Sequence, residues 1–289
     1  MMAGLSSVAL VFVAAATPAG AVHEKSRGEM AEALAKWHQA HAGFDARLDA
    51  VTRAFRGTPY RFDPLGEGPS GRYDREPIVN WRRVDCLTFV EQSIAFAWHG
   101  KLDEAIDELQ RIRYVGGKID FSTRNHFMAA WWLRRNADAG FVRDVTREVG
   151  GEATRVLRKV VAPRAWADRN RKWVRRIGLE NLPKAYDIAY IPIAVALRIA
   201  SRIPSGTILS DVREDLPTTP VTVSHTGFVM EVAGRKVFRH ASGRGRFVED
   251  TPLERYLRYL KQSVKEKQAG RPWRVLGINL ARVLAPGPR

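Results

Sequence analysis

Apolar residues recur at helical spacing in the first half of the chain and alternate with polar residues in much of the last third. Because a helix repeats every 3.6 residues and a strand every two, these patterns separate the two kinds of element. The first pattern predicts helices at residues 29–41, 44–55, 86–98 and 102–112, and one that carries Trp131 and Trp132. The second predicts antiparallel strands at 207–212, 225–232, 236–240 and 246–248, with a hairpin turn at Gly234-Arg235.

The remaining segments complete an α+β pattern. Residues 141–145 and 156–161 are short β-prone pieces, 166–177 is a basic amphipathic helix, 253–264 is a helix and 273–284 forms a last strand or two. Helices first and a sheet afterwards are typical of the α+β class. The sequence has no internal repeat and no clear linker, so we predict a single domain with helical insertions.

The single cysteine, Cys86, begins one of the predicted helices. Asp85 before it is a good N-cap residue, because its carboxylate can accept from the N–H groups of the first helical turn. At such a position the unsatisfied N–H groups and the helix dipole favour a thiolate over a thiol. A buried core cysteine is the alternative. The helix start and the preceding aspartate favour a nucleophile.

Two histidines lie where a base for this nucleophile would be needed. His225 begins one predicted strand and His240 ends its hairpin partner, so the two rings are expected side by side. A thiol nucleophile needs a base, and a third polar group to hold the imidazole. We assign Cys86 as nucleophile, His225 as base and His240 as the orienting residue. Gly227, just after the base, is interpreted as leaving room for substrate.

The alternatives to this assignment are kept open. Each histidine could be an ordinary hydrogen-bonded strand residue, or the roles of His225 and His240 could be reversed. A zinc site made of the same three residues is a further reading, but metal sites usually contain a close-spaced ligand pair, and the sequence has none. The last alternative is a module without catalytic activity that binds an anionic wall polymer, which the high charge would suit.

The charge balance is strongly basic. Forty-seven Lys and Arg residues against 31 Asp and Glu give a net charge of +16 and a pI near 10.4. Such a chain suits polyanionic surroundings: nucleic acid, an anionic membrane face or an anionic wall polymer. The sequence contains no nucleic-acid-binding motif, so we predict no nucleic-acid partner.

The first residues predict export. An apolar run at 5–16 is followed by Ala19-Gly20-Ala21, which resembles a signal-peptidase site, and the run is too short to span a bilayer. We therefore predict a signal peptide at 1–21, a single domain at 22–289 with its core at about 44–284, and a periplasmic or cell-envelope location.

Four short motifs, in order, resemble those of the NlpC-type, papain-like cell-wall hydrolases. They are Gly57-Thr58-Pro59-Tyr60, Asp85-Cys86, Ser224-His225-Thr226-Gly227-Phe228 and His240-Ala241-Ser242. The longer stretches 85–91 and 122–127 are similar to one branch, the N-acetylmuramoyl-L-alanine amidase-like family, first described as a domain of unknown function. The resemblance covers residues 44–284.

This resemblance implies a papain-like fold, in which helices with the catalytic cysteine at a helix start pack on an antiparallel sheet or half-barrel. It implies a peptidoglycan hydrolase that cleaves the amide between N-acetylmuramic acid and L-alanine, without cofactor or metal. Tyr60 would help the Cys86 N–H hold the oxyanion. Arg124 is the candidate to bind a carboxylate of the stem peptide; its alternative role is a structural ion pair. Ser224 and Asp85 are further substrate-binding candidates. A γ-D-glutamyl-diaminopimelate endopeptidase with the same catalytic set is the alternative activity.

Overall fold

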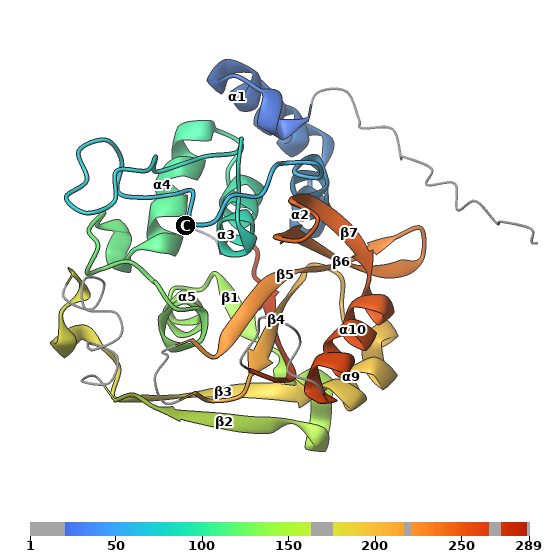
Figure 1. Ribbon diagram of the computed structural model, residues 1–289. Helices are drawn as coiled ribbons and strands as arrows, with labels where there is room; N and C mark the ends of the chain where they lie inside the picture. The colour runs from blue at the N-terminus through green and yellow to red at the C-terminus, as the bar shows by residue number, and fades with distance from the viewer. Residues whose placement is uncertain (1–20, 163–175, 217–220, 266–272, 288–289) are drawn as a thin grey trace, which may run out of the picture.

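The computed structural model describes residues 21–162, 176–216, 221–265 and 273–287. The predicted signal peptide, apart from Ala21, lies outside these ranges, as does nearly all of the predicted basic helix at 166–177. Within them the α+β prediction is confirmed, since helices pack on an antiparallel sheet (Figure 1). No helix within these ranges is long and apolar enough to cross a membrane.

Most of the described α-helices lie in the first half of the chain, and the others lie in the second half. They are α1 (Arg27–Ala40), α2 (Phe44–Ala54), α3 (Cys86–Trp98), α4 (Leu102–Arg113), α5 (Leu133–Asp138), α6 (Thr146–Gly150), α9 (Ile193–Ile199) and α10 (Leu253–Lys265). A π-helical turn, Met128–Trp132, leads into α5. The long predicted helices therefore lie within one or two residues of their predicted limits.

Eight strands form a sheet in which neighbouring strands are antiparallel. They are β1 (Val142–Asp144), β2 (Arg155–Val160), β3 (Ala185–Pro192), β4 (Thr207–Arg213), β5 (Val223–Val232), β6 (Arg235–Ser242), β7 (Phe247–Pro252) and β8 (Val275–Val283). Their order is β2-β3-β8-β4-β5-β6-β7, with β1 on β8. The last strand thus lies in the middle of the sheet, between β3 and β4.

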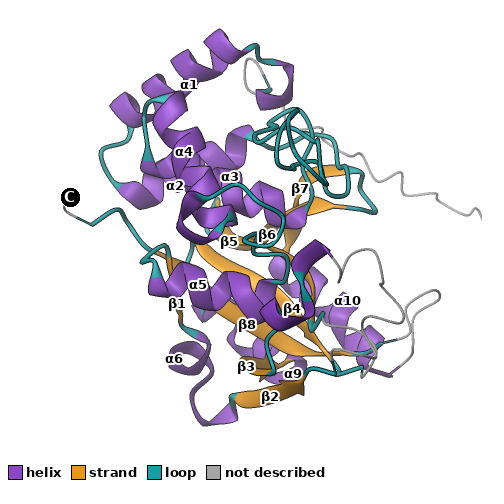
Figure 2. Cartoon of the chain, turned by 90° about the vertical axis from the view of Figure 1, so that its left-hand side faces the viewer, coloured by secondary structure: helices purple, strands orange, loops and turns teal. Residues whose placement is uncertain are grey.

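Side chains alternate between two buried faces of this sheet. On β4 and β5, Ile208 and Phe228 join the core that contains α2, α3 and α4. Their neighbours Leu209 and Val229 join a second core with α9 and α10. Figure 2 shows the first group of helices above the strands and α9 and α10 beside them. The period of two therefore buries apolar side chains against helices on both faces.

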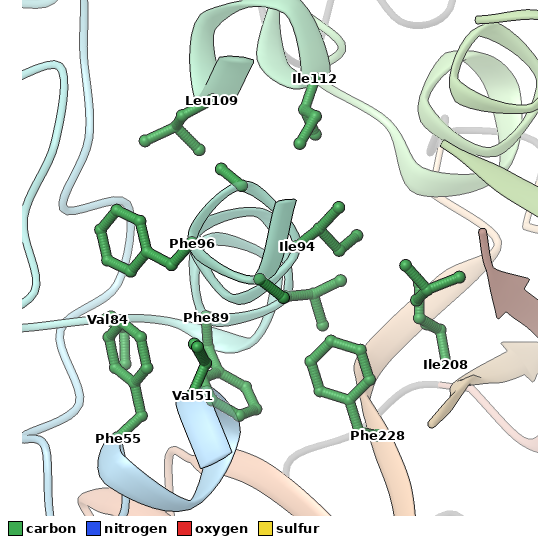
Figure 3. Close-up of a cluster of buried hydrophobic side chains, with 14 of the residues drawn as sticks. Val51, Phe55, Val84, Phe89, Ile94, Phe96, Leu109, Ile112, Ile208 and Phe228 are labelled. Atoms are coloured by element: carbon green, nitrogen blue, oxygen red, sulfur yellow. The ribbon is translucent and has the colours of Figure 1, made fainter. Parts of the chain in front are cut away.

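Helix α3 is the centre of the larger core. Ten of its thirteen residues are buried, where an apolar stripe along one face was predicted. Viewed along its axis, α3 is ringed by Phe55, by Leu109 and Ile112 of α4, and by Phe228 of β5 (Figure 3). A helix that is apolar on most sides belongs in a core. Truncating a fully buried phenylalanine such as Phe89 to alanine is expected to cost about 3–5 kcal/mol.

The elements β3 and α9 were not predicted. In β3 only Ile188 and Ile191 are buried, while most of the other side chains are half-buried, so the strand has no clean alternation. Tyr186 and Tyr190 pack partly against the core instead. Because half-buried residues occupy both faces of β3, it carries only a weak period of two, and the sequence pattern missed it.

Candidate active site

A cavity of about 720 Å³ lies between the start of α3 and the start of β5. Five of the seven predicted site residues line it: Cys86, His225, Arg124, Ser224 and Asp85. Tyr60 and His240 are not among its lining residues. His240 contacts His225, which lines the cavity, and Tyr60 lies near Cys86 and Asp85, which also line it. Segments more than a hundred positions apart in the sequence thus meet at one cavity.

Asp85 places Cys86 at the first position of α3. Its Oδ1 accepts from the Thr88 N–H at 2.8 Å and from the Thr88 hydroxyl at 2.8 Å, and the Thr88 hydroxyl in turn accepts from the Asp85 N–H at 2.9 Å. This is the predicted N-cap, in its reciprocal form. Its Oδ2 accepts from the Asp63 N–H at 3.0 Å. The Asp85 carboxylate is therefore engaged on both oxygens inside the protein.

The surroundings of Cys86 do not by themselves yield a thiolate. Burial, and then the nearby Asp85 carboxylate, raise the pKa of Cys86 to about 12, although the N–H groups of Thr226, Leu87 and Cys86 lower it. The N–H groups at the helix start favour the thiolate in the expected direction, but desolvation outweighs them. The N–H of Thr226 reaches the sulfur, and Thr226 directly follows His225. A base beside the thiol is thus required, and His225 is the titratable residue of that strand that lines the cavity.

His225 and His240 meet as the hairpin predicted. His225 Nε2 and His240 Nδ1 are 2.8 Å apart, with the rings nearly perpendicular. On its other side, His240 Nε2 lies 3.2 Å from the hydroxyl of Thr251 in β7. The ring of Phe238 stacks on His240, with centroids 4.6 Å apart. Burial in these surroundings lowers the pKa of His240 to about 4, so the ring is neutral at pH 7.

Gly227 has a packing role that the sequence analysis did not predict. A Cβ at this position would lie 2.7 Å from His240 Cβ, 2.9 Å from the Phe238 ring and 2.6 Å from the Arg239 carbonyl oxygen. The missing side chain therefore makes room for His240 and Phe238, and the prediction that it makes room for substrate is not needed to explain it. Glycine is required here for the approach of His240 to His225.

Tyr60 is held beside the start of α3 by backbone pairing. Its N–H donates to the Arg246 carbonyl at 2.7 Å, and it forms a parallel bridge with Val84. Burial, and then the nearby Cys86 and Asp85, raise the pKa of Tyr60 to about 12. The phenol therefore keeps its proton at neutral pH and can donate a hydrogen bond. This is the property that an oxyanion-binding hydroxyl needs.

Arg124 forms ion pairs with carboxylates of the loop at 61–80. Its two terminal nitrogens donate to Asp63 at 2.6 Å and to Asp74 at 2.8 Å. Although burial opposes its charge, Asp63 above all raises the pKa of the Arg124 guanidinium, so it stays protonated. Asp63 itself has a left-handed backbone, with φ of 49°. Arg124 thus ties the loop to the segment that follows α4, which matches the structural ion pair considered as its alternative.

Among the described residues, Ser224 is the one predicted substrate-binding residue whose polar group has no hydrogen-bond partner. Its hydroxyl is buried, and the buried indole N–H of Trp273, another cavity-lining residue, also has no partner within the described part of the chain. Buried donors of this kind are usually satisfied. They are places where a substrate oxygen would be bound at little desolvation cost.

One buried carboxyl at the cavity was not assigned from the sequence. Glu91 lies on α3 in the stretch quoted for the family resemblance, and it lines the cavity. It accepts from the Trp132 indole at 3.0 Å and lies 3.6 Å from Arg113. Burial raises the pKa of Glu91 to about 7, although Arg113 and Arg124 lower it. A lone acidic residue in an apolar helix was the only signal available.

The described residues contain no group of three or more His, Cys, Asp or Glu side chains arranged to hold a metal ion. The His225 nitrogen that faces His240 is 2.8 Å from a ring nitrogen, which leaves no space for a metal between them. The zinc-hydrolase reading therefore lacks a ligand set within this part of the chain.

A family model described as N-acetylmuramoyl-L-alanine amidase-like matches residues 50–263. The matched segment is well over half of the 289 residues, and it includes the motifs around Cys86, His225 and His240. The chain belongs to this family. The predicted resemblance to the amidase-like branch is therefore confirmed.

Two solved structures share the fold of this amidase-like protein. A Legionella pneumophila protein assigned to the family DUF1460 superposes with a TM-score of 0.77 at 24% identity, over 90% of this chain and 96% of its own. An N-acetylmuramoyl-L-alanine amidase from Bacteroides uniformis superposes with a TM-score of 0.63 at 22% identity, over 83% and 99%. Among curated proteins, no sequence matches the amidase-like chain.

Proposed function

We propose that the protein is a peptidoglycan amidase that cleaves the bond between N-acetylmuramic acid and L-alanine, with Cys86 as its nucleophile on a papain-like, NlpC-type fold. One observation carries the proposal. A cysteine at a helix start and a histidine share a 720 Å³ cavity, and that histidine lies 2.8 Å from a second, buried one. The family membership gives the substrate class.

The first step is proton transfer from the thiol. Because burial raises the pKa of Cys86 to about 12, the thiolate forms only as the proton passes to a base. Nε2 of His225 faces His240, so Nδ1 is the nitrogen that takes the proton. The resulting imidazolium donates Nε2–H to the neutral His240, which stabilises the thiolate–imidazolium pair.

The thiolate then attacks the carbonyl carbon of the lactyl group. The oxyanion accepts from the N–H of Cys86, which has no partner inside the helix, and from the protonated hydroxyl of Tyr60. His225 returns its proton to the amine of L-alanine as the C–N bond breaks. Water, with His225 as base, then hydrolyses the thioester and regenerates the thiol.

The walls of the cavity suggest how substrate is held. Ser224 and Trp273 offer donors to carbonyl and hydroxyl oxygens of the muropeptide. Asp85 acts on substrate through the position that it gives Cys86, since both its oxygens are engaged. Arg124 would reach a stem-peptide carboxylate only by sharing its guanidinium with Asp63 and Asp74.

We also propose that the protein is exported and works in the periplasm or cell envelope. The support is the apolar run and the Ala19-Gly20-Ala21 sequence, both of which fall at or before the first described residue. A net charge of +16 suits an anionic wall polymer or membrane face. Sequencing the N-terminus of the protein recovered from its native cell tests this, and a chain still starting at Met1 or Met2 would contradict it.

Digestion of purified muropeptides tests the activity. The expected products, identified by mass spectrometry, are a free N-acetylmuramic acid end and a peptide that begins with L-alanine. Cleavage between γ-D-glutamate and diaminopimelate would instead establish the endopeptidase alternative. The matched control is Cys86→Ala, which should release nothing, while activity that survives iodoacetamide would contradict the thiol mechanism.

A further inference from the structure

The hydrogen bonds of the two histidines continue one residue further than the predicted catalytic set. His225 Nε2 meets His240 Nδ1 at 2.8 Å, and His240 Nε2 meets the hydroxyl of Thr251 at 3.2 Å. Thr251 lies on β7, whose residues pair with β6 in regular register. Three side chains from three adjacent strands therefore form one line that leads away from the cavity.

The direction of each bond in this line follows from the chemistry. Once His225 has taken the proton of Cys86, both of its ring nitrogens carry hydrogen, and Nε2–H must find an acceptor. That acceptor is Nδ1 of His240, which can serve only if it carries no hydrogen. A neutral imidazole has one N–H, so the hydrogen of His240 must be on Nε2. Nε2 faces Thr251, whose hydroxyl oxygen can accept it.

We propose that Thr251 is a positioning residue of the catalytic set, because its hydroxyl accepts the Nε2–H of His240 and so keeps the Nδ1 of His240 ready to accept from His225. The inference rests on the proposed thiol mechanism and adds a fourth member to it. The tautomer of the orienting residue decides whether it helps or opposes the base, and an orienting group in the wrong tautomer is expensive in related triads.

The surroundings of His240 favour this arrangement. The charged and titratable groups around it are His225 on β5, its register partner Glu249 and Asp250 on β7, and Tyr256 on α10. Asp250 is bound by the guanidinium of Arg239 at 2.7 and 3.0 Å, so its charge is compensated there. Burial outweighs the opposing effect of Asp250 and lowers the pKa of His240 to about 4, so the ring is neutral at pH 7. Thr251 supplies the hydroxyl at the one ring nitrogen that His225 does not use.

The test compares Thr251→Val, which keeps the shape and removes the hydroxyl, with Thr251→Ser, which keeps the hydroxyl. The iodoacetamide alkylation rate of Cys86 is measured against pH, because it reports the thiolate–imidazolium pair without any peptidoglycan substrate. Thr251→Val should lower the rate at pH 7 about fivefold, the loss that corresponds to one hydrogen bond of ordinary net strength. Thr251→Ser should restore most of that rate.

A second measurement reads the tautomer itself. In ¹⁵N-histidine NMR spectra, wild-type His240 should carry its hydrogen on Nε2, and Thr251→Val should show a mixture of tautomers. The matched control is Thr207→Val on β4, which removes a buried hydroxyl without a hydrogen-bond partner and should change neither readout.

Three results would overturn the proposal. They are an unchanged alkylation profile together with an unchanged tautomer in Thr251→Val, a loss in Thr251→Ser as large as in Thr251→Val, or a wild-type His240 with its hydrogen on Nδ1. Failure of the proposed amidase function looks different: Cys86→Ala would still cleave muropeptides, while the NMR spectra would still decide which nitrogen of His240 is protonated.

Discussion

The two sides of the cavity hold their polar side chains in opposite ways. On the sheet side, His225, His240 and Thr251 form a line of hydrogen bonds between neighbouring strands. On the helix side, the guanidinium of Arg124 is shared between the carboxylates of Asp63 and Asp74. The first set consists of groups that can exchange a proton or turn a tautomer. The second consists of fixed charges that neutralise one another.

This difference separates chemistry from support. A line of hydrogen bonds with a neutral His240 behind the base can pass a proton and return it at low cost. A guanidinium clamped by two carboxylates cannot change its protonation, but it fixes a long loop at the rim of the cavity. The sheet side is therefore the place where substitutions should alter rates, and the helix side is where they should alter stability first.

The largest expected effect is the loss of the base. His225→Ala should lower kcat on muropeptides by about a thousandfold or more, because in the proposed mechanism His225 both takes the thiol proton and protonates the leaving amine. Cys86 should then react with iodoacetamide only as pH rises far above neutrality, since its pKa is raised to about 12 by burial. Circular dichroism should show an unchanged fold. A variant that keeps a fast-reacting thiol at pH 7 would make another group the base.

The second effect tests the ion pairs that Arg124 forms with Asp63 and Asp74. Arg124→Gln leaves the largely buried carboxylate of Asp74 and the half-exposed carboxylate of Asp63 without their cation. Because solvent screens the Asp63 pair, the free energy of unfolding should fall by about 1–2 kcal/mol, measured by denaturant unfolding. Asp74→Asn is the matched change from the other side and should cost less, because Arg124 keeps Asp63. Comparing KM on muropeptides with and without a free stem carboxylate shows whether Arg124 also binds substrate. A stable Arg124→Gln with a raised KM would make it a binding residue instead.

These two regions also differ in how far the sequence could predict them. Helix α3 starts and ends at the predicted residues, Cys86 and Trp98, because an N-cap aspartate and a dense apolar pattern mark it. The hairpin placed His225 beside His240. A structural ion pair was only one of two interpretations of Arg124, since Asp63 and Asp74 lie 61 and 50 residues away in a loop without periodicity.

Contacts that run diagonally between elements could not be predicted from the sequence either. Thr251 reaches His240 diagonally between the neighbouring strands β7 and β6, and the approach of His240 and Phe238 explains why Gly227 is a glycine. Neither relation has a spacing that repeats along the chain. The protonation of Cys86 depends on burial, and the apolar pattern does not report how deeply one thiol is covered.

The third effect is a pH dependence of the free energy of unfolding that arises from Glu91, on the helix side of the cavity. Burial raises the pKa of Glu91 from 4.5 to about 7, so the folded state holds its proton more tightly than the unfolded state. This contribution to stability is complete below pH 4.5 and is lost as pH rises to about 7, by at most about 3 kcal/mol. Glu91→Gln lacks the titration. Its stability relative to wild type, from denaturant unfolding, should therefore increase between pH 4.5 and pH 8.

A constant difference between Glu91→Gln and wild type across that range would mean that Glu91 is ionised in the folded protein throughout. Glu91 would then form a full ion pair with Arg113, from which it is 3.6 Å away. The matched control is Glu104→Gln on the exposed face of α4, whose pKa is lowered by Lys101 and which should not produce this increase above pH 4.5.

The smallest effect sharpens the sheet side, where the roles of the two histidines must be distinguished. His240→Gln replaces the ring by an amide whose oxygen can still accept from Nε2–H of His225, so kcat should fall by about tenfold, far less than in His225→Ala. Cys86 should keep a form that iodoacetamide alkylates near neutral pH. The reverse result, in which His240→Gln loses this reactive form and His225→Ala retains it, would exchange the two roles. It would also require His240, now 2.8 Å behind His225, to reach the thiol by a route that the strand pairing of β5 and β6 does not provide.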